Sequence, residues 1–376
     1  MPCFLFSLTS KYGLNGGGYI LNIMHKPFWL FLIIISLLPV FESRAAFAAS
    51  VEDDEVYRSR YENTIFGRRF YNVESIKHHN AWDMVKWGIT GKREKWPEWV
   101  NIEPGETPPE RVEKGIRYTV VNHATVLIQV DGINILTDPI WSMRASMLSW
   151  IGPKRAVPPG ITFDQLPPID VVLISHNHYD HMDIPTLERL AKRDNPLVVT
   201  GLGNQQILQR YGIKNVQELD WWKGFTRGGI EFCFTPARHF SRRGATDYNL
   251  SLWGSFIIRT PSGVICFIGD SGYGSFIKKI RRRFGPVDLA FIPIGAYEPA
   301  WMMETVHLTP EEAWRVHEEL GSSLSVAIHF GTFQLTDEGI NDPVERLGKM
   351  IIQNGKASGK FVVPTFGKNM APVQMD

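Results

Sequence analysis

The stretch Ser175-His176-Asn177-His178-Tyr179-Asp180-His181 places three histidines and an aspartate within six positions. It follows the apolar run 171–174 (VVLI), which predicts a buried β-strand that ends at this point. In an extended chain His176, His178 and Asp180 share one face, and a turn can bring His181 round to it. Imidazole and carboxylate groups at this density suit zinc or a similar divalent ion. The stretch therefore predicts a metal site at a strand end.

Three later segments show the same order of apolar strand followed by a candidate metal ligand. Residues 232–237 lead to His239, residues 264–269 lead to Asp270, and residues 325–328 lead to His329. Each of these residues alone would be ordinary at the end of a strand. Because ligands in α/β proteins come from the carboxyl ends of strands, where loops converge, the four segments together predict one shared site.

The organisation of the chain changes at Arg117. From there, short apolar runs ended by Gly, Asp or Pro alternate with helical stretches, and no internal repeat is present. The predicted helices span 184–193, 203–211, 274–284 and 310–320, the last with Thr309 as its cap, a proline at its first position and an acidic first turn. We therefore predict one α/β domain over residues 117–376, preceded by an N-terminal wrap of short helices and loops over residues 49–116.

The composition of the 376 residues excludes several classes of protein. Lys and Arg number 40 and Asp and Glu number 39, so the basic excess of a nucleic-acid-binding protein is absent and no nucleic-acid partner is expected. Three cysteines are too few for a disulfide scaffold or a four-cysteine zinc ribbon. Cys233 and Cys266 lie in apolar, strand-like runs and are predicted to be buried thiols, with a disulfide as the alternative if their strands adjoin.

The first 48 residues have the pattern of an export signal. The run 28–40 (FWLFLIIISLLPV) has no charge and is short for a membrane-spanning helix, but it is typical of a signal-peptide core. Ala46 and Ala48 stand at the −3 and −1 positions of a cleavage site. We expect an exported, periplasmic or envelope-associated protein cut near Ala48, with an uncleaved anchor as the alternative, and translation that begins at Met24. Intact mass tests both, and a product that keeps Cys3 would refute the later start.

The pattern His176-x-His178-x-Asp180-His181, followed by His239, Asp270 and His329, resembles the metallo-β-lactamase superfamily. Several stretches between residues 117 and 335 are similar to one of its branches, the N-acylphosphatidylethanolamine-hydrolysing phospholipases D. They are LTDPIWSMRAS (136–146), IGPKR (151–155), ELDWW (218–222), LWGSF (252–256), GDSGY (269–273), RFGPVDLAFIPIGAYEP (283–299), HLTPEEA (307–313) and AIHFGTF (327–333). The resemblance implies an αββα sandwich with a dinuclear metal site at its edge.

Carried over residue by residue, the resemblance implies two zinc ions per chain. The implied ligands are His176, His178 and His239 for one ion, Asp180, His181 and His329 for the other, and Asp270 as a bridge between them. A water held between two such ions would be a hydroxide near neutral pH, because zinc lowers the pKa of bound water to about 7. That hydroxide would attack the phosphorus atom of the substrate.

Further roles follow from the same resemblance. Asp180, Asp270 and His307 are the implied catalytic residues, and His307 would protonate the leaving oxygen or bind the phosphate. Asp138, in the LTDP turn, is expected to support a ligand histidine, and His123 is expected to lie near the site.

The implied activity is hydrolysis of N-acylphosphatidylethanolamine-like phospholipids to N-acylethanolamine and phosphatidic acid. A peripheral membrane contact and a homodimer are implied with it. Trp82, Trp87, Trp96, Trp99 and the basic run 278–283 could meet a lipid surface, or they could be core residues and a solvated helix face. Two other functions stay open: a hydrolase of the same fold that cleaves a lactone, a β-lactam or another phosphodiester, and a non-catalytic envelope protein. Seven metal donors argue against the latter.

Overall fold

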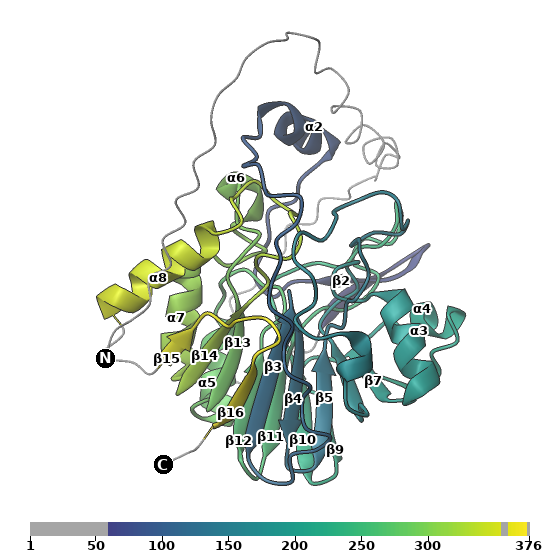
Figure 1. Cartoon of the computed structure of the whole chain (residues 1–376). Coiled ribbons are helices and arrows are strands. Elements are labelled where there is room, and N and C mark those ends of the chain that lie inside the picture. The colour runs from purple at the N-terminus through teal and green to yellow at the C-terminus, as the bar shows by residue number, and fades with distance from the viewer. Residues whose placement is uncertain (1–58, 355–359, 374–376) are drawn as a thin grey trace.

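The computed structural model describes residues 59–354 and 360–373. The expected export signal, its cleavage point and the start at Met24 lie outside these residues. Within them, two seven-stranded sheets pack face to face, and helices cover the outer faces (Figure 1). The αββα sandwich expected from the resemblance is therefore confirmed.

The first sheet has the order β16-β3-β4-β5-β6-β7-β8. Its strands are β3 (Ile116–Asn122), β4 (Thr125–Val130), β5 (Ile133–Thr137), β6 (Val171–Ile174), β7 (Leu197–Gly201), β8 (Val216–Leu219) and β16 (Asn369–Val373). Strands β5 to β8 run parallel, and α3 (Ile184–Arg193) and α4 (Gln205–Arg210) lie in the connections. All four residues of β6 are buried, as expected for a central strand covered on both faces.

The second sheet has the order β15-β14-β13-β12-β11-β10-β9. Its strands are β9 (Gly224–Arg227), β10 (Ile230–Thr235), β11 (Ser255–Thr260), β12 (Gly263–Phe267), β13 (Leu289–Pro293), β14 (Leu324–Ile328) and β15 (Lys360–Val362). The helices of this half are α5 (Phe276–Phe284), α6 (Ala300–Met303), α7 (Pro310–Leu320) and α8 (Asp342–Asn354). Aromatic and branched side chains of both sheets form one main core cluster between them.

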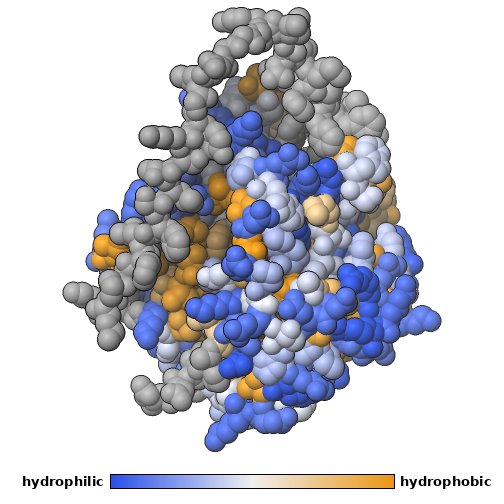
Figure 2. All heavy atoms as spheres, in the orientation of Figure 1, coloured by the Kyte–Doolittle hydropathy of each residue, from blue (hydrophilic) through white to orange (hydrophobic). Residues whose placement is uncertain are grey.

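The predicted helices are confirmed, and two of them have the predicted bounds. Helix α3 spans 184–193 and buries its apolar side chains against the first sheet, while Figure 2 shows a mainly hydrophilic surface over α3 and α4. Helix α7 begins after Thr309, whose hydroxyl accepts the backbone N–H of Glu312 at 3.2 Å. The Glu312 carboxylate accepts the Thr309 backbone N–H at 3.0 Å, which completes a capping box.

The two described cysteines are free, buried thiols, as predicted. Cys233 of β10 and Cys266 of β12 both pair with Ile257 of the intervening strand β11. Because a whole strand separates them, the disulfide alternative is wrong.

The described part of the N-terminal wrap differs from the prediction in one respect. It contains a hairpin of β1 (Arg60–Thr64) and β2 (Gly67–Tyr71) before helix α2 (Ala81–Thr90), where only helices and loops were expected. Strand β1 is exposed at four of its five positions, so it lacks the apolar alternation by which a strand is recognised. Among the described residues, no helix is long and apolar enough to span a bilayer.

Candidate metal centre

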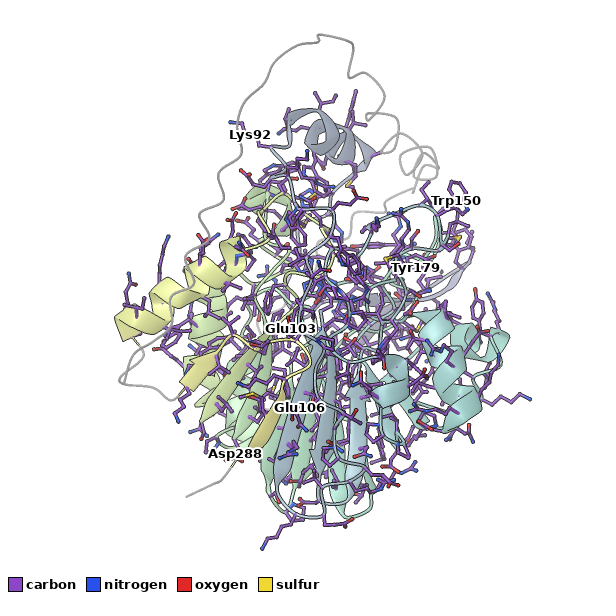
Figure 3. All side chains as sticks on the ribbon, in the orientation of Figure 1. Lys92, Glu103, Glu106, Trp150, Tyr179 and Asp288 are labelled. Atoms are coloured by element: carbon purple, nitrogen blue, oxygen red, sulfur yellow. The ribbon has the colours of Figure 1, made fainter. Side chains whose placement is uncertain are left out.

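Four strands deliver the predicted ligands to one end of the sandwich. The loop after β6 carries His176 to His181, and short segments after β10, β12 and β14 carry His239, Asp270 and His329. In Figure 3, Tyr179 of the first loop lies towards the upper end of the molecule, whereas Asp288, which precedes β13, lies at the lower end. The structure brings all seven predicted ligands together; their role as ligands remains a prediction.

The first group of donors consists of His176, His178 and His239. The Nε2 atom of His176 lies 2.8 Å from Nδ1 of His178, and Nε2 of His239 lies 3.3 Å from the same nitrogen. The His239 Nδ1–H donates to the Val306 carbonyl at 2.8 Å, which leaves the Nε2 lone pair of the neutral ring facing the group.

The charge state of this first group suits a cation. Burial lowers the pKa of His178 to about 3 and that of His239 to about 4, and it holds the pKa of His176 well below its ordinary value. The rings are therefore neutral at pH 7. Neutral imidazoles with converging nitrogens are the form in which histidine binds a metal.

The second group consists of Asp180, His181 and His329, with His123 beside them. The Oδ2 atom of Asp180 lies 3.2 Å from Nε2 of His181 and 3.5 Å from Nε2 of His329. The expectation that His123 lies near the site is met: its Nε2 is 2.8 Å from Asp180 Oδ2, and its carbonyl accepts the backbone N–H of His329 at 2.7 Å. His123 thus holds two members of this group.

Asp270 stands between the two groups. Its Oδ2 atom lies 3.2 Å from Nε2 of His181 and 3.0 Å from Nε2 of His329, both of the second group. The same oxygen is 3.9 Å from Nε2 of His239 in the first group. One carboxylate oxygen therefore faces donors of both groups, which is the arrangement that a bridging ligand needs.

Burial and opposite charges balance in the second group. Burial by itself would raise the pKa of Asp270, but His181 and His329 hold it well below its ordinary value. Burial would likewise lower the pKa of the two histidines, but the neighbouring carboxylates raise that of His329 to about 9 and that of His181 well above its ordinary value. Protons on these rings offset the carboxylate charge, a task that a divalent cation performs when it replaces them.

Several buried polar atoms in this cluster have no hydrogen-bond partner. They include Oδ1 of Asp270 and Nδ1 of His329. Nε2 of His181 and Nε2 of His329 also form no hydrogen bond, although they lie 3.2 and 3.0 Å from Oδ2 of Asp270. Buried polar atoms are normally paired, because leaving one unpaired costs about 1–3 kcal/mol. Unpaired imidazole nitrogens and carboxylate oxygens are donor types that zinc prefers, so they fit a metal centre.

Asp138 contacts a predicted ligand histidine, as the sequence suggests, and that histidine is His181. Oδ2 of Asp138 lies 2.7 Å from Nδ1 of His181, so the other ring nitrogen points to Asp180 and Asp270. The Ser175 backbone N–H and hydroxyl donate to the Asp138 carboxyl group at 2.7 and 2.6 Å. A carboxylate that fixes the far side of a ligand histidine is a regular feature of zinc sites.

Asn72, in the wrap, is a site residue that sequence reasoning missed. Its Nδ2 donates to the carbonyl of His239 at 2.7 Å, and its Oδ1 accepts the His239 backbone N–H at 3.1 Å. The wrap therefore holds the backbone of a predicted ligand that lies 167 positions away. No motif around Asn72 signals this role, since an isolated asparagine after a strand is usual in a loop.

His307 lies beside the two groups, between α6 and α7. Its Nδ1 is 3.8 Å from Oδ2 of Asp270, and its ring centroid is 5.1 Å from that of His239. The side chains of His307 and Asp180 are each 11% exposed, against 2% or less for Asp270 and His329. His307 and Asp180 are therefore not fully shielded from solvent, and the catalytic role of His307 stays a prediction.

Comparison with known proteins agrees with this geometry. The family model described as a beta-lactamase superfamily domain matches residues 133–330. The chain is 37% identical over 252 residues to N-acyl-phosphatidylethanolamine-hydrolyzing phospholipase D 1 of Caenorhabditis elegans, covering 64% of this chain and 70% of that protein. It is 33% identical over 258 residues to the mitochondrial enzyme of the same name from Saccharomyces cerevisiae, covering 67% of this chain but only about half, 53%, of the yeast protein.

A solved structure supports the same fold. The structure of a possible metal-dependent hydrolase from Veillonella parvula matches with a TM-score of 0.57 at 16% identity, over 68% of this chain and 99% of the other. From the family match, the relatives and the converging donors, we conclude that the chain belongs to the beta-lactamase superfamily and is a metal-dependent hydrolase of the metallo-β-lactamase fold.

Proposed function

We propose that the chain is a zinc-dependent phosphodiesterase of the phospholipase D type that hydrolyses N-acylphosphatidylethanolamine-like lipids to N-acylethanolamine and phosphatidic acid. The observation that carries the proposal is the convergence of seven imidazole and carboxylate donors into two groups that Asp270 joins. The two relatives named N-acyl-phosphatidylethanolamine-hydrolyzing phospholipase D support the substrate class.

Two zinc ions are the cations that we infer for the centre. His176, His178 and His239 would hold one, Asp180, His181 and His329 the other, and Asp270 would contact both. Five imidazoles and two carboxylates form a donor set that zinc favours. When bound, the pair of ions would polarise the phosphoryl oxygens and lower the pKa of a water.

The residues of the chain prepare this chemistry. Asp180 and Asp270 are held ionised, so they supply the negative charge that two dications need. Asp138 fixes the orientation of His181, and His123 fixes that of Asp180.

We infer that the substrate enters beside His307, whose side chain is 11% exposed. Burial holds the pKa of His307 well below its ordinary value, so its neutral ring can donate one N–H to a phosphoryl or leaving oxygen. In the overall reaction, water supplies a hydroxyl group to phosphorus, the bond from phosphorus to the ethanolamine oxygen breaks, and a proton is transferred to that oxygen.

The test combines metal content with turnover. We would measure zinc per chain after loading, and assay the protein on N-acylphosphatidylethanolamine, bis(p-nitrophenyl) phosphate, a lactone and a β-lactam. We expect two zinc ions and release of N-acylethanolamine, both reduced in Asp270→Asn and unchanged in Asp164→Asn, whose side chain is 92% exposed. Less than one zinc per chain would refute the zinc centre, and cleavage of the lactone or β-lactam alone would refute the phosphodiesterase assignment.

A further inference from the structure

Residues 143–150, which we call the apolar loop, expose an unusual run of large apolar side chains. Trp150 is 70% exposed and Met147 is 66% exposed, and Met143 and Leu148 are also exposed. Single exposed apolar residues are common on soluble proteins, whereas a contiguous group marks a contact with a partner or a membrane. No described part of the chain covers these four side chains.

Hydrogen bonds within the chain hold the base of the apolar loop. At its base the Ala145 backbone N–H donates to the Pro153 carbonyl at 3.1 Å, and the Arg155 backbone N–H donates to the Met143 carbonyl at 2.9 Å. The Arg144 guanidinium donates to the Gly152 carbonyl at 2.6 Å and so links the two ends of the segment. Because the base of the loop is already ordered, binding through these side chains would cost little conformational entropy of the backbone.

The base of the apolar loop is built into the wall of the metal centre. Arg155 is buried, donates to the Ile140 carbonyl at 3.0 Å and stacks over the ring of Phe333 at 5.1 Å. That ring lies 5.4 Å from the ring of His123, the partner of Asp180. Figure 3 shows Trp150 at the same upper end of the molecule as Tyr179, far from Asp288.

Charge around the apolar loop favours a lipid surface as its partner. Between Asp138 and Asp164 the chain has no acidic residue but three cations, Arg144, Lys154 and Arg155. Arg155 is buried, so Arg144 and Lys154 are the cations near the base of the loop. Each has a partner within the protein: Arg144 donates to the Gly152 carbonyl, and the Lys154 ammonium lies 3.2 Å from the exposed Glu98 carboxylate, a pair that lipid phosphates would have to displace. The order of tip and base matches that of a bilayer: the aromatic and aliphatic tip would lie among the acyl chains, and the cations at the base would lie at the layer of phosphates.

The basic run 278–283 on α5 fits a membrane contact less well. Lys278 lies 3.5 Å from the Glu319 carboxylate, and the guanidinium of Arg283 lies over the ring of Trp222. The difference from the apolar loop is that no group of exposed apolar side chains accompanies the cations of α5.

We propose that the apolar loop inserts into the lipid surface that contains the substrate, with Arg144 and Lys154 at the level of the headgroup phosphates. Because the base of the loop reaches His123 and Asp180 through Arg155 and Phe333, insertion brings the centre close to the headgroup layer. This inference rests on the proposed function, since it names the surface on which that activity takes place.

A label placed in the loop tests the inference directly. In the full chain with Cys3→Ser, the variant Met147→Cys is labelled with nitrobenzoxadiazole, and Ile352→Cys on α8 is the control because Ile352 is 86% exposed. Cys233 and Cys266 are buried, so they stay unlabelled. Vesicles of phosphatidylethanolamine and phosphatidylglycerol are then added, with and without a doxyl-labelled lipid as quencher.

We expect the emission at position 147 to shift to shorter wavelength and to be quenched by the doxyl lipid, while the label at 352 does not respond. The double variant Met147→Ser/Trp150→Ser should weaken vesicle binding at least about tenfold, because both apolar side chains then leave the bilayer. An unresponsive label at 147 would refute the inference. So would a response that follows protein concentration without vesicles, because it would indicate a second copy of the chain.

The two proposals can fail separately. The fluorescence readout needs no turnover, so a loop that enters vesicles in a protein without lipid hydrolysis would refute the proposed function alone. Hydrolysis of N-acylphosphatidylethanolamine vesicles together with an unresponsive label would refute the loop contact alone.

Discussion

Gly269 is a position where both the fold and the candidate metal centre depend on the absence of a side chain. It precedes Asp270 and has φ +65°, and a Cβ added there would lie 2.6 Å from the Cβ of Ser175, which precedes His176. Ser175 has no room to retreat, because its backbone N–H and hydroxyl are bound to Asp138 and its carbonyl accepts the Gly254 N–H at 3.0 Å. Alanine at 269 therefore forces apart two strand ends that carry predicted ligands.

The cost of Gly269→Ala has two parts. The left-handed backbone costs a non-glycine residue about 1–2 kcal/mol, and overpacking of a buried contact costs about 1–3 kcal/mol. We expect the free energy of unfolding to fall by about 2–5 kcal/mol in urea denaturation of the metal-free protein. Zinc affinity should fall at least about tenfold, because Asp270 and His176 no longer keep their separation.

Gly212→Ala is the matched control for this experiment. Gly212 has φ +78°, but a Cβ there would meet nothing within 4 Å, so only the backbone cost of about 1–2 kcal/mol applies. Its zinc affinity should equal that of the unaltered protein. If Gly269→Ala is no less stable than Gly212→Ala and binds zinc equally well, the close approach of the two strand ends does not constrain the centre, and the reasoning is refuted.

Three further predictions concern the groups around the centre. Asp138→Asn should lower zinc affinity about 10–100-fold in competition titrations by loosening His181, whereas Asp164→Asn should not change it. His307→Gln should keep the zinc content but lower kcat about 10²–10⁴-fold, and loss of zinc instead would assign it as a ligand. Zinc binding should release protons from His181 and His329, so affinity should rise with pH up to about 9, where the metal-free His329 loses its proton unaided. Calorimetry in buffers of different protonation enthalpy measures this release, and a pH-independent affinity would contradict it.

Much of the fold and most of the candidate centre are readable from local sequence, because local rules govern them. Helix α7 follows from its cap at Thr309 and its N1 proline, and the buried strand β6 follows from an uninterrupted apolar run. The cluster from His176 to His181 is dense enough to indicate a metal site without any long-range contact.

Other features depend on contacts between distant segments. The β1–β2 hairpin has no apolar alternation, and the partnership of Asn72 with His239 joins residues that no local pattern relates. Whether the tryptophans of the wrap are core or surface was equally open: Trp87 is 6% exposed, but Trp82 is 76% exposed. In each case the outcome depends on which surface packs against the segment.

The sequence by itself determined which residues are candidates for the chemistry and at which strand ends they stand, since strand periodicity and ligand density are local properties. Only the tertiary structure decided that Asp270 faces both donor groups, that Asp138 holds His181, and that the apolar loop shares a wall with the centre. The physical reason is that distances between side chains are set by how the two sheets and their loops pack, and packing depends on the whole chain at once.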